Sequence, residues 1–345
     1  MGILSGASDF FGLDIGTSAV RVVQLRGGRQ KSLMHYGSKP IDVKVSQSDA
    51  PADQQKVAQI VREVIIEAGI STTNVAVGIP SSKVFSAVVD MDRLSHDELA
   101  KTIRYQADAL IPTPLAESKI DWALLGDSPK EPSKVEVLLS SVSNDFIEKR
   151  LDMLESIGLN VIAFEPDSLA VTRALLAEDH VAPTLLVDMG DISSDLIMVL
   201  NGVPRLMRTI PVGNESIVKA ATQNLSIDEK QATQFVYKFG LSRDKLEGQI
   251  YNAIIGSVDV LVSEIEKSIK FFQARYNNTK IDRIIVTGGA STLPELPLYI
   301  ANKFAVTVEI GNAWRNVLFG QERQNELMTM SHQFSVAAGL AERNE

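Results

Sequence analysis

Apolar residues recur every three or four positions in several stretches of the chain, a spacing that places them on one face of an α-helix. The first predicted helix covers Ala52–Ala68, and two others begin at capping-box patterns, Ser95 with Glu98 and Ser226 with Glu229. Further helices complete the pattern, so that the predicted set covers about residues 52–68, 95–111, 144–157, 226–240 and 246–276. The last helix is the longest, and its length suits a helix buried between two lobes.

Shorter runs between these helices are rich in β-branched residues and are predicted to be strands. They cover residues 12–25, 75–89, 135–142, 161–164, 185–200, 284–286 and 306–310. Strands and helices therefore interleave, which indicates an α/β architecture with helices packed on mixed sheets. The polar stretch 125–133, with GDSPKEPS at its core, is interpreted as a hairpin tip within a small subdomain.

Two distant segments repeat each other without a gap. GLDIGTSAVRVVQLRGG, starting at Gly12, aligns with LVDMGDISSDLIMVLNG, starting at Leu186, so that Asp14 falls on Asp188. In both copies an apolar strand ends in Asp-x-Gly, turns through small polar residues and returns as a second apolar strand. The repeat predicts two equivalent lobes.

The residues of the two turns suit a phosphate group. Gly16 and Gly190 let the backbone approach a ligand closely, and the amides that follow can point at anionic oxygens. Asp14 and Asp188 would repel a bare phosphate but favour a hydrated Mg²⁺ that bridges phosphates. The hydroxyl side chains that follow the glycines are those of Thr17, Ser18, Ser193 and Ser194.

Two other interpretations of the turns are open. Each Asp-x-Gly sequence could merely begin a hairpin, as Asp and Gly often do. A bilobal aspartic protease also carries two Asp-x-Gly turns, which bring two carboxylates together. Its middle residue bears a hydroxyl, however, whereas Ile15 and Met189 stand here, and that class is nearly all β. The matched pair of turns favours phosphate binding over both alternatives.

A third glycine turn follows another apolar strand. In the sequence IIVTGGASTL, Gly288 and Gly289 precede a helix, where the backbone can pack flat against a planar ring or a phosphate. On the longest predicted helix, Glu264, Lys267 and Ser268 share a face from which they could reach a ribose and base. The plainer interpretations are a tight strand-to-helix connection and an exposed salt-bridged face.

Charge and cysteine content narrow the classes of partner. The chain has 34 Lys and Arg against 43 Asp and Glu, and a net charge of −9 repels nucleic-acid phosphates and anionic lipid headgroups. Zero Cys excludes a disulfide scaffold, a thiolate zinc site and a cysteine nucleophile. Since neither a signal peptide nor a membrane-crossing stretch is recognisable, we expect a cytosolic protein that binds no nucleic acid and does not insert into the membrane.

The order of these motifs resembles the actin/Hsp70/FtsA ATPase superfamily over essentially the whole chain. The order is a phosphate turn, the strand-to-helix sequence AFEPDSLA, a second phosphate turn, the Gly-Gly turn and a final small-residue helix, SVAAGLA. Within that superfamily, FFGLDIGTSAVRVVQL, FEPDSLAVTRALL, RTIPVGNESI and EIEKSIKFFQARY look like the PilM family, cytosolic actin-like proteins of type IV pilus assembly.

The resemblance implies an α/β, two-lobed actin-like ATPase fold, a duplicated ribonuclease H-like fold with an inserted FtsA-type small subdomain. Residues 1–77 and 163–182 are expected to form the core of the first lobe, residues 78–162 the inserted subdomain and residues 183–345 the second lobe. The last helix, at about residues 331–343, is expected to return toward the interlobe hinge.

The resemblance also implies that ATP and Mg²⁺ bind between the lobes, with weak or no ATPase activity. Asp14 and Asp188 match carboxylates that hold the magnesium through water. Glu165 matches a polar residue near the hydrolytic water and is the candidate general base, although a structural role at a helix start is an equal alternative. The residues that match nucleotide contacts are Gly16, Thr17, Ser18, Gly190, Asp191, Gly213, Asn214, Glu264, Lys267, Ser268, Gly288 and Gly289.

Members of that family are assembly components under the inner membrane. The resemblance implies binding to the N-terminal peptide of a PilN-like membrane protein at the junction of the inserted subdomain and the first lobe, and contact with other pilus platform proteins. An FtsA-like division filament, which relies on an amphipathic membrane anchor that we do not expect here, is the alternative. A sugar kinase of the same superfamily is a third interpretation, for which we identify no aspartate base.

Overall fold

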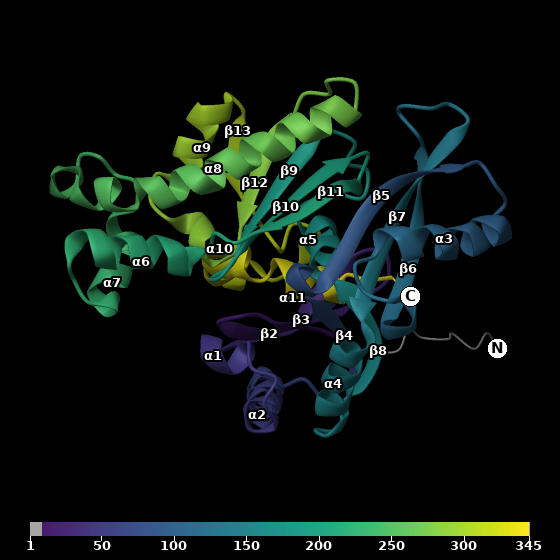
Figure 1. Cartoon of the computed structure of the whole chain (residues 1–345). Coiled ribbons are helices and arrows are strands. Elements are labelled where there is room, and N and C mark those ends of the chain that lie inside the picture. The colour runs from purple at the N-terminus through teal and green to yellow at the C-terminus, as the bar shows by residue number, and fades with distance from the viewer. Residues whose placement is uncertain (1–8, 345) are drawn as a thin grey trace.

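The computed structural model describes residues 9–344, whose strands form three sheets (Figure 1). Residues 1–8, where we recognise no signal peptide, and residue 345 lie outside the described residues. The first sheet has the strand order β14-β3-β2-β1-β4-β8. Its strands are β1 (Phe11–Ile15), β2 (Ala19–Arg26), β3 (Lys31–Pro40), β4 (Asn74–Ile79), β8 (Asn160–Pro166) and β14 (Val317–Leu318).

The second sheet repeats the arrangement of the first. Its order is β11-β10-β9-β12-β13, and β9 pairs antiparallel with β10 and parallel with β12, as β1 does with β2 and β4. The strands are β9 (Thr184–Met189), β10 (Ser194–Leu200), β11 (Val203–Ile210), β12 (Arg283–Thr287) and β13 (Thr307–Ile310). The predicted duplication is confirmed at the level of sheet topology. Mixed sheets with helices on their faces also exclude the bilobal aspartic protease, which is nearly all β.

Helices pack against all three sheets. They are α1 (Val43–Ser46), α2 (Pro51–Ala68), α3 (His96–Leu110), α4 (Asn144–Glu155), α5 (Asp167–Leu175), α6 (Asn214–Leu225), α7 (Glu229–Phe239), α8 (Gln249–Arg275), α9 (Leu296–Phe304), α10 (Gln324–Met330) and α11 (Ser335–Ala341). Among residues 9–344, no helix is both long enough and apolar enough to span a membrane. We call the first sheet with its covering helices the first lobe, and the second sheet with its helices the second lobe.

The helix starts follow their side-chain caps. The capping box at Ser95 is confirmed, because the Ser95 amide donates to Glu98 Oε2 at 3.0 Å. The predicted box at Ser226 is wrong. Ser226 ends α6 in the left-handed region with φ of 53°, and Asp228 caps α7 by accepting a hydrogen bond from the Gln231 amide at 2.9 Å. Both Ser226 and Asp228 are residue types that can cap a helix start. Because Ser226 already ends α6, Asp228 is the cap of α7.

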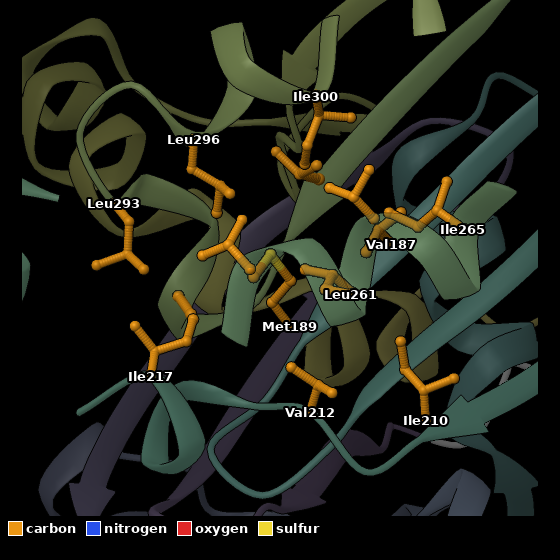
Figure 2. Packing of buried hydrophobic residues seen from close by; sticks show 14 of the residues in the cluster. Val187, Met189, Ile210, Val212, Ile217, Leu261, Ile265, Leu293, Leu296 and Ile300 are labelled. Carbon is orange, nitrogen blue, oxygen red and sulfur yellow. The ribbon is translucent and has the colours of Figure 1, made fainter. Parts of the chain in front are cut away.

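The longest helix, α8, lies on the outer face of the second sheet, so the expectation that it would be buried between the lobes is wrong. Figure 2 shows Leu261 and Ile265 of α8 packed over Val187 and Met189 of β9. Alternation along β9 turns Leu186 to the opposite face of the sheet, where it packs against α5 and α11. The two shorter helices therefore occupy the space between the sheets (Figure 1).

The contact between α5 and α11 depends on small residues. A Cβ atom added at Gly339 of α11 would lie 1.9 Å from the Ala170 carbonyl oxygen of α5. One added at Gly12 of β1 would lie 2.3 Å from the Ala337 carbonyl oxygen of α11. The backbones of these elements approach so closely that only glycine fits at either position.

The third sheet forms the inserted subdomain, with α3 on one face. Its order is β5-β7-β6, and its strands are β5 (Val84–Asp92), β6 (Ser118–Asp127) and β7 (Lys134–Ser143). The predicted hairpin tip at residues 125–133 is confirmed, since it joins the antiparallel strands β6 and β7. Helix α4 and the start of β8 were expected in this subdomain, which was given the limit of residue 162. They instead join the first lobe, because α4 packs beside α2 and β8 pairs with β4 in the first sheet.

A buried charged cluster attaches the inserted subdomain to the second lobe. Glu136 of β7 is 1% exposed, and its carboxylate accepts from Arg205 of β11 at 2.6 Å and from Arg275 of α8 at 2.7 Å. The Tyr276 hydroxyl donates to the same carboxylate at 2.9 Å, and Asp90 of β5 accepts from Arg275 at 3.0 Å. Removing Glu136 would leave two arginines without their main partner.

Replacing Gly339 with alanine tests the α5–α11 contact. We expect Gly339→Ala to lower the free energy of unfolding by about 1–3 kcal/mol, because the rigid backbone at Ala170 cannot yield to the new methyl group. Gly256→Ala is the matched control: Gly256 is an exposed position within α8 with no atom near its added Cβ, so this change should stabilise by about 0.5–1 kcal/mol. Urea denaturation measures both, and equal stability of Gly339→Ala and wild type would contradict the contact.

Candidate functional site: a pocket between the two lobes

The two repeated turns have the same backbone geometry. In the β1–β2 hairpin Asp14 pairs with Arg21, and the Gly16 amide donates to the Ala19 carbonyl at 3.0 Å. In the β9–β10 hairpin Asp188 pairs with Asp195 in the equivalent register, and the Gly190 amide donates to Ser193 at 3.0 Å. The repeat in the sequence therefore corresponds to a repeat in the structure.

The two turns line one pocket, which we call the interlobe pocket. Its volume is about 430 Å³, and residues of both lobes form its walls. Ten of the residues singled out from the sequence lie there together: Asp14, Gly16, Thr17, Ser18, Asp188, Gly190, Asp191, Ser193, Gly288 and Gly289. The added Cβ of Gly288, whose φ is 84°, would lie 2.5 Å from Asp188 Oδ1, so this glycine brings the third turn against the second.

The carboxyl groups of the pocket are held away from water and close to one another. Desolvation raises the pKa of Asp188 to about 7, with Asp195 and Asp14 adding repulsion. Desolvation also raises the pKa of Asp14, although Arg21 at 3.4 Å opposes the rise. The pKa of Asp167 lies well above its usual value for the same reason, together with repulsion from Asp14. These carboxylates lack sufficient positive charge around them.

The donor set of the pocket fits Mg²⁺ bound to phosphates. Asp167 Oδ1 is buried without a hydrogen-bond partner. Within residues 9–344 no three His, Asp or Glu gather closely enough to bind a metal by themselves. A magnesium ion there would take its other ligands from water and phosphate, as Mg²⁺ commonly does. Six acidic and three basic side chains line the pocket: Asp14, Asp49, Asp167, Asp188, Asp191 and Asp195, with Arg21, Lys83 and Arg150.

Glu165, the candidate general base, is not placed for that role. It is 3% exposed and is not among the residues that line the interlobe pocket. Its Oε1 accepts from Arg173 of α5 at 2.6 Å, and its Oε2 accepts from Arg343 at 2.7 Å. Both oxygens therefore tie β8 to α5 and to the chain after α11. Asp167, two residues further on, lines the pocket instead.

Gly213 and Asn214 lie behind the second turn rather than on the pocket wall. The backbone amide of Asn214 donates to the Gly190 carbonyl oxygen at 3.0 Å. A Cβ added at Gly213 would lie 2.4 Å from the Asp191 carbonyl oxygen. These contacts fix the turn against the start of α6. The two residues are thus positioned to shape the turn, whereas the sequence analysis expected them to contact the nucleotide.

The trio on α8 lies outside the interlobe pocket. Lys267 pairs with Glu264 at 2.6 Å, and Arg208 of β11 contacts both Glu264 and Ser268. Ser268 is fully buried and also donates to the Glu264 carbonyl at 2.8 Å. The second half of α8 thus packs toward β11, and the plainer interpretation of the trio as a salt-bridged face is the one that the structure supports.

Several residues of the interlobe pocket were not predicted from the sequence. Arg21 and Asp195 occupy equivalent positions of the repeat, so the alignment of the two copies contained the signal that could have identified them. Asp167 lies within the quoted AFEPDSLA motif, but the sequence does not show which of its two acidic residues lines the pocket. Arg150 of α4 carries no local signal, because only tertiary packing brings it to the pocket.

The raised pKa of Asp188 predicts a pH dependence. The folded protein retains this proton up to about pH 7, whereas the unfolded chain loses it near the ordinary value of 3.8. The associated stability is complete below about pH 4 and is lost as the pH rises to about 7. Asp188→Asn stays neutral, so in the absence of ligand its free energy of unfolding should increase relative to wild type between about pH 5 and about pH 8. Urea denaturation at both values measures this difference.

Asp127→Asn, a change at an exposed aspartate on β6, is the control for the pH experiment. It should keep a constant difference from wild type. A constant difference for Asp188→Asn as well would contradict the electrostatic description of the pocket.

Comparison with known proteins agrees with this fold. The PilM–PilN type IV pilus biogenesis complex contains a chain that matches with a TM-score of 0.83 and 23% identity, covering 97% of this chain and 98% of that one. EutJ of Carboxydothermus hydrogenoformans matches with a TM-score of 0.56 and 14% identity, covering 96% and 88%. MreB5 of Spiroplasma citri bound to ADP matches with a TM-score of 0.55 and 13% identity, covering 96% of this chain and 94% of that one. The fold is a two-lobed actin-like one.

The family is given by the sequence. The model of the family described as type IV pilus assembly protein PilM matches residues 12–345. This match includes both Asp-x-Gly turns, the inserted subdomain and α11, and it favours the resemblance drawn from the motifs over the FtsA-like and sugar-kinase alternatives. The chain belongs to the PilM family of type IV pilus assembly proteins.

Proposed function

We propose that the chain is an actin-like, ATP-binding component of the type IV pilus assembly platform that also binds the N-terminal tail of a PilN-like membrane protein. The single observation that carries the nucleotide part is the convergence of two duplicated Asp-x-Gly turns and a Gly-Gly turn on one pocket. This arrangement places backbone amides and carboxylates from opposite sides around one ligand, as a magnesium-bound triphosphate requires.

The residues of the pocket divide the work of binding. The amides and hydroxyls at Gly16–Ser18 and the amide at Gly190 would bind phosphate oxygens, and Gly288 with Gly289 would lie against the adenosine. Asp14 and Asp188 would hold Mg²⁺ through water. When bound, Mg²⁺ neutralises phosphate charge and so removes the repulsion between the carboxylates and the phosphates.

Asp167 takes the place that the sequence analysis gave to Glu165. Asp167 lines the pocket at the start of α5, so its carboxylate could accept a hydrogen bond from a water molecule beside the phosphates. The carboxylate is surrounded by other acids, and it attracts a proton strongly. Burial and the neighbouring acids raise its pKa and so favour the protonated form, which orients water less well than the carboxylate does, and we therefore propose slow ATP hydrolysis at most.

A second pocket suits a peptide. It has a volume of about 280 Å³ and lies between the inserted subdomain and the first lobe, and we call it the apolar pocket. Trp122 and Ala123 of β6, Leu138 of β7, Ile147 of α4 and Phe164 of β8 contribute to its walls. Because β6 is an edge strand of the third sheet, its free backbone groups can also pair with an extended peptide.

Capture of a membrane protein's tail would give this chain its place in the cell. The solved complex named above joins a PilM to a PilN, and we transfer that partner to this chain. The chain would then be cytoplasmic and peripheral to the inner membrane, held there by its partner. Other pilus platform proteins would contact the remaining surface.

Replacing Asp14 tests the nucleotide part. Calorimetry should show that wild type binds ATP much more tightly with Mg²⁺ than without it. Asp14→Ala should lower affinity for Mg·ATP at least about tenfold and weaken the dependence on Mg²⁺, because Arg21 is left free to attract bare phosphate. Asp127→Ala, at an exposed aspartate, is the control. Equal binding by Asp14→Ala and wild type would contradict the metal assignment.

Neighbouring residues of β6 test the peptide part. Ala123 lines the apolar pocket, whereas Leu124 is 55% exposed on the other face of the same strand. Ala123→Glu should weaken binding of a fluorescent peptide with the PilN-like N-terminal sequence at least about tenfold, because the peptide would bury an unpaired carboxylate. Leu124→Glu should bind like wild type. Equal affinities of the two variants, measured by fluorescence polarisation, would place the peptide elsewhere.

A further inference from the structure

Helix α4 brings an arginine to the interlobe pocket from the first lobe. Arg150 lines this pocket together with Phe146, which lies one turn earlier on α4. The guanidinium carbon of Arg150 lies 5.5 Å from the centre of the Phe146 ring, so the aromatic face supports the side chain. The arginine is thereby held in an orientation toward the pocket.

The guanidinium group of Arg150 has an N–H donor without an acceptor. Arg150 Nη1 is buried and has no hydrogen-bond partner, and within residues 9–344 no carboxylate lies within ion-pair distance of Arg150. Asp167 and Asp49 act on it only from further away. A buried guanidinium donor without a partner is costly, because it has lost water and gained nothing in return. An anion in the pocket would supply the missing acceptor.

The position of Arg150 distinguishes one end of the pocket from the other. Gly288 and Gly289 belong to the second-lobe wall, where Gly288 is in close contact with Asp188. Arg150 belongs to the first-lobe wall, and the carboxylates that act on its charge include Asp167 at the start of α5. A nucleotide whose adenosine lies at the glycines would direct its phosphate tail toward Asp167 and Arg150.

We propose that Arg150 binds the terminal phosphate of a nucleoside triphosphate and is the residue by which this protein distinguishes ATP from ADP. The proposal rests on the proposed nucleotide function of the interlobe pocket. A guanidinium presents two parallel N–H donors to a phosphate, and its charge offsets the excess of acidic residues around the phosphate tail. A diphosphate ends before this position and leaves the arginine without its acceptor.

The test compares nucleotides that differ in the terminal phosphate. Isothermal calorimetry with Mg²⁺ would measure AMP-PNP and ADP on wild type, Arg150→Gln and Arg150→Lys. Arg150→Gln should lower affinity for AMP-PNP about 10- to 100-fold and change affinity for ADP by less than about threefold. Arg150→Lys keeps the charge but loses the paired donors, so it should recover part of the loss. Lys149→Gln, at the neighbouring exposed position of α4, should match wild type.

The outcomes separate the inference from the function on which it rests. A loss confined to AMP-PNP supports the inference, and Arg150→Lys provides the answer should Arg150→Gln fail to fold in a thermal melt. An equal loss for both nucleotides, or no loss for either, would overturn the assignment of Arg150 while leaving nucleotide binding intact. Failure of wild type to bind either nucleotide would instead overturn the proposed function itself.

Discussion

The crowding of carboxylates between the lobes is the constraint on which the rest of the structure depends. Burial raises the pKa values of Asp14, Asp167, Asp188 and Asp195, and repulsion from neighbouring carboxylates adds to the rise at Asp167 and Asp188. Such a group of charges is stable only if protons or a bound cation neutralise it. The protein holds the group in place with the apolar packing of α5 and α11, where contacts through Gly339 fix the distance between the two sheets.

The two proposed binding sites share their walls. Helix α4 presents Phe146 and Arg150 to the interlobe pocket and Ile147 to the apolar pocket, and α5 presents Asp167 to the first and Leu169 to the second. The elements between the sites are short and well packed, so a shift of either helix alters both pockets together. The Glu136 cluster adds a second connection, because it joins the inserted subdomain to the second lobe, whereas the apolar pocket lies against the first lobe.

The sequence predicted features that local chemistry determines. The duplicated hairpins were recognisable because glycine and aspartate fix the turn, and the strand pattern follows from alternation. Features set by tertiary packing were not. Glu165 and Asp167 are both acidic and adjoin the same proline, and only the contacts with Arg173 and Arg343 show that the first is structural. The length of α8 indicated burial without indicating which face of which sheet it covers.

One of the differences between the two copies of the repeat reverses a charge in the interlobe pocket. Arg21 and Asp195 stand at equivalent places in the two hairpins, yet they carry opposite charges. A perfectly symmetric pair of hairpins would be related by a pseudo-twofold axis, and an elongated anion could then enter in either of two directions with equal energy. The exchange of arginine for aspartate removes that degeneracy. The unequal cross-strand pairs, Asp14 with Arg21 in one hairpin and Asp188 with Asp195 in the other, therefore give the pocket a polarity by which the two ends of a ligand can be distinguished.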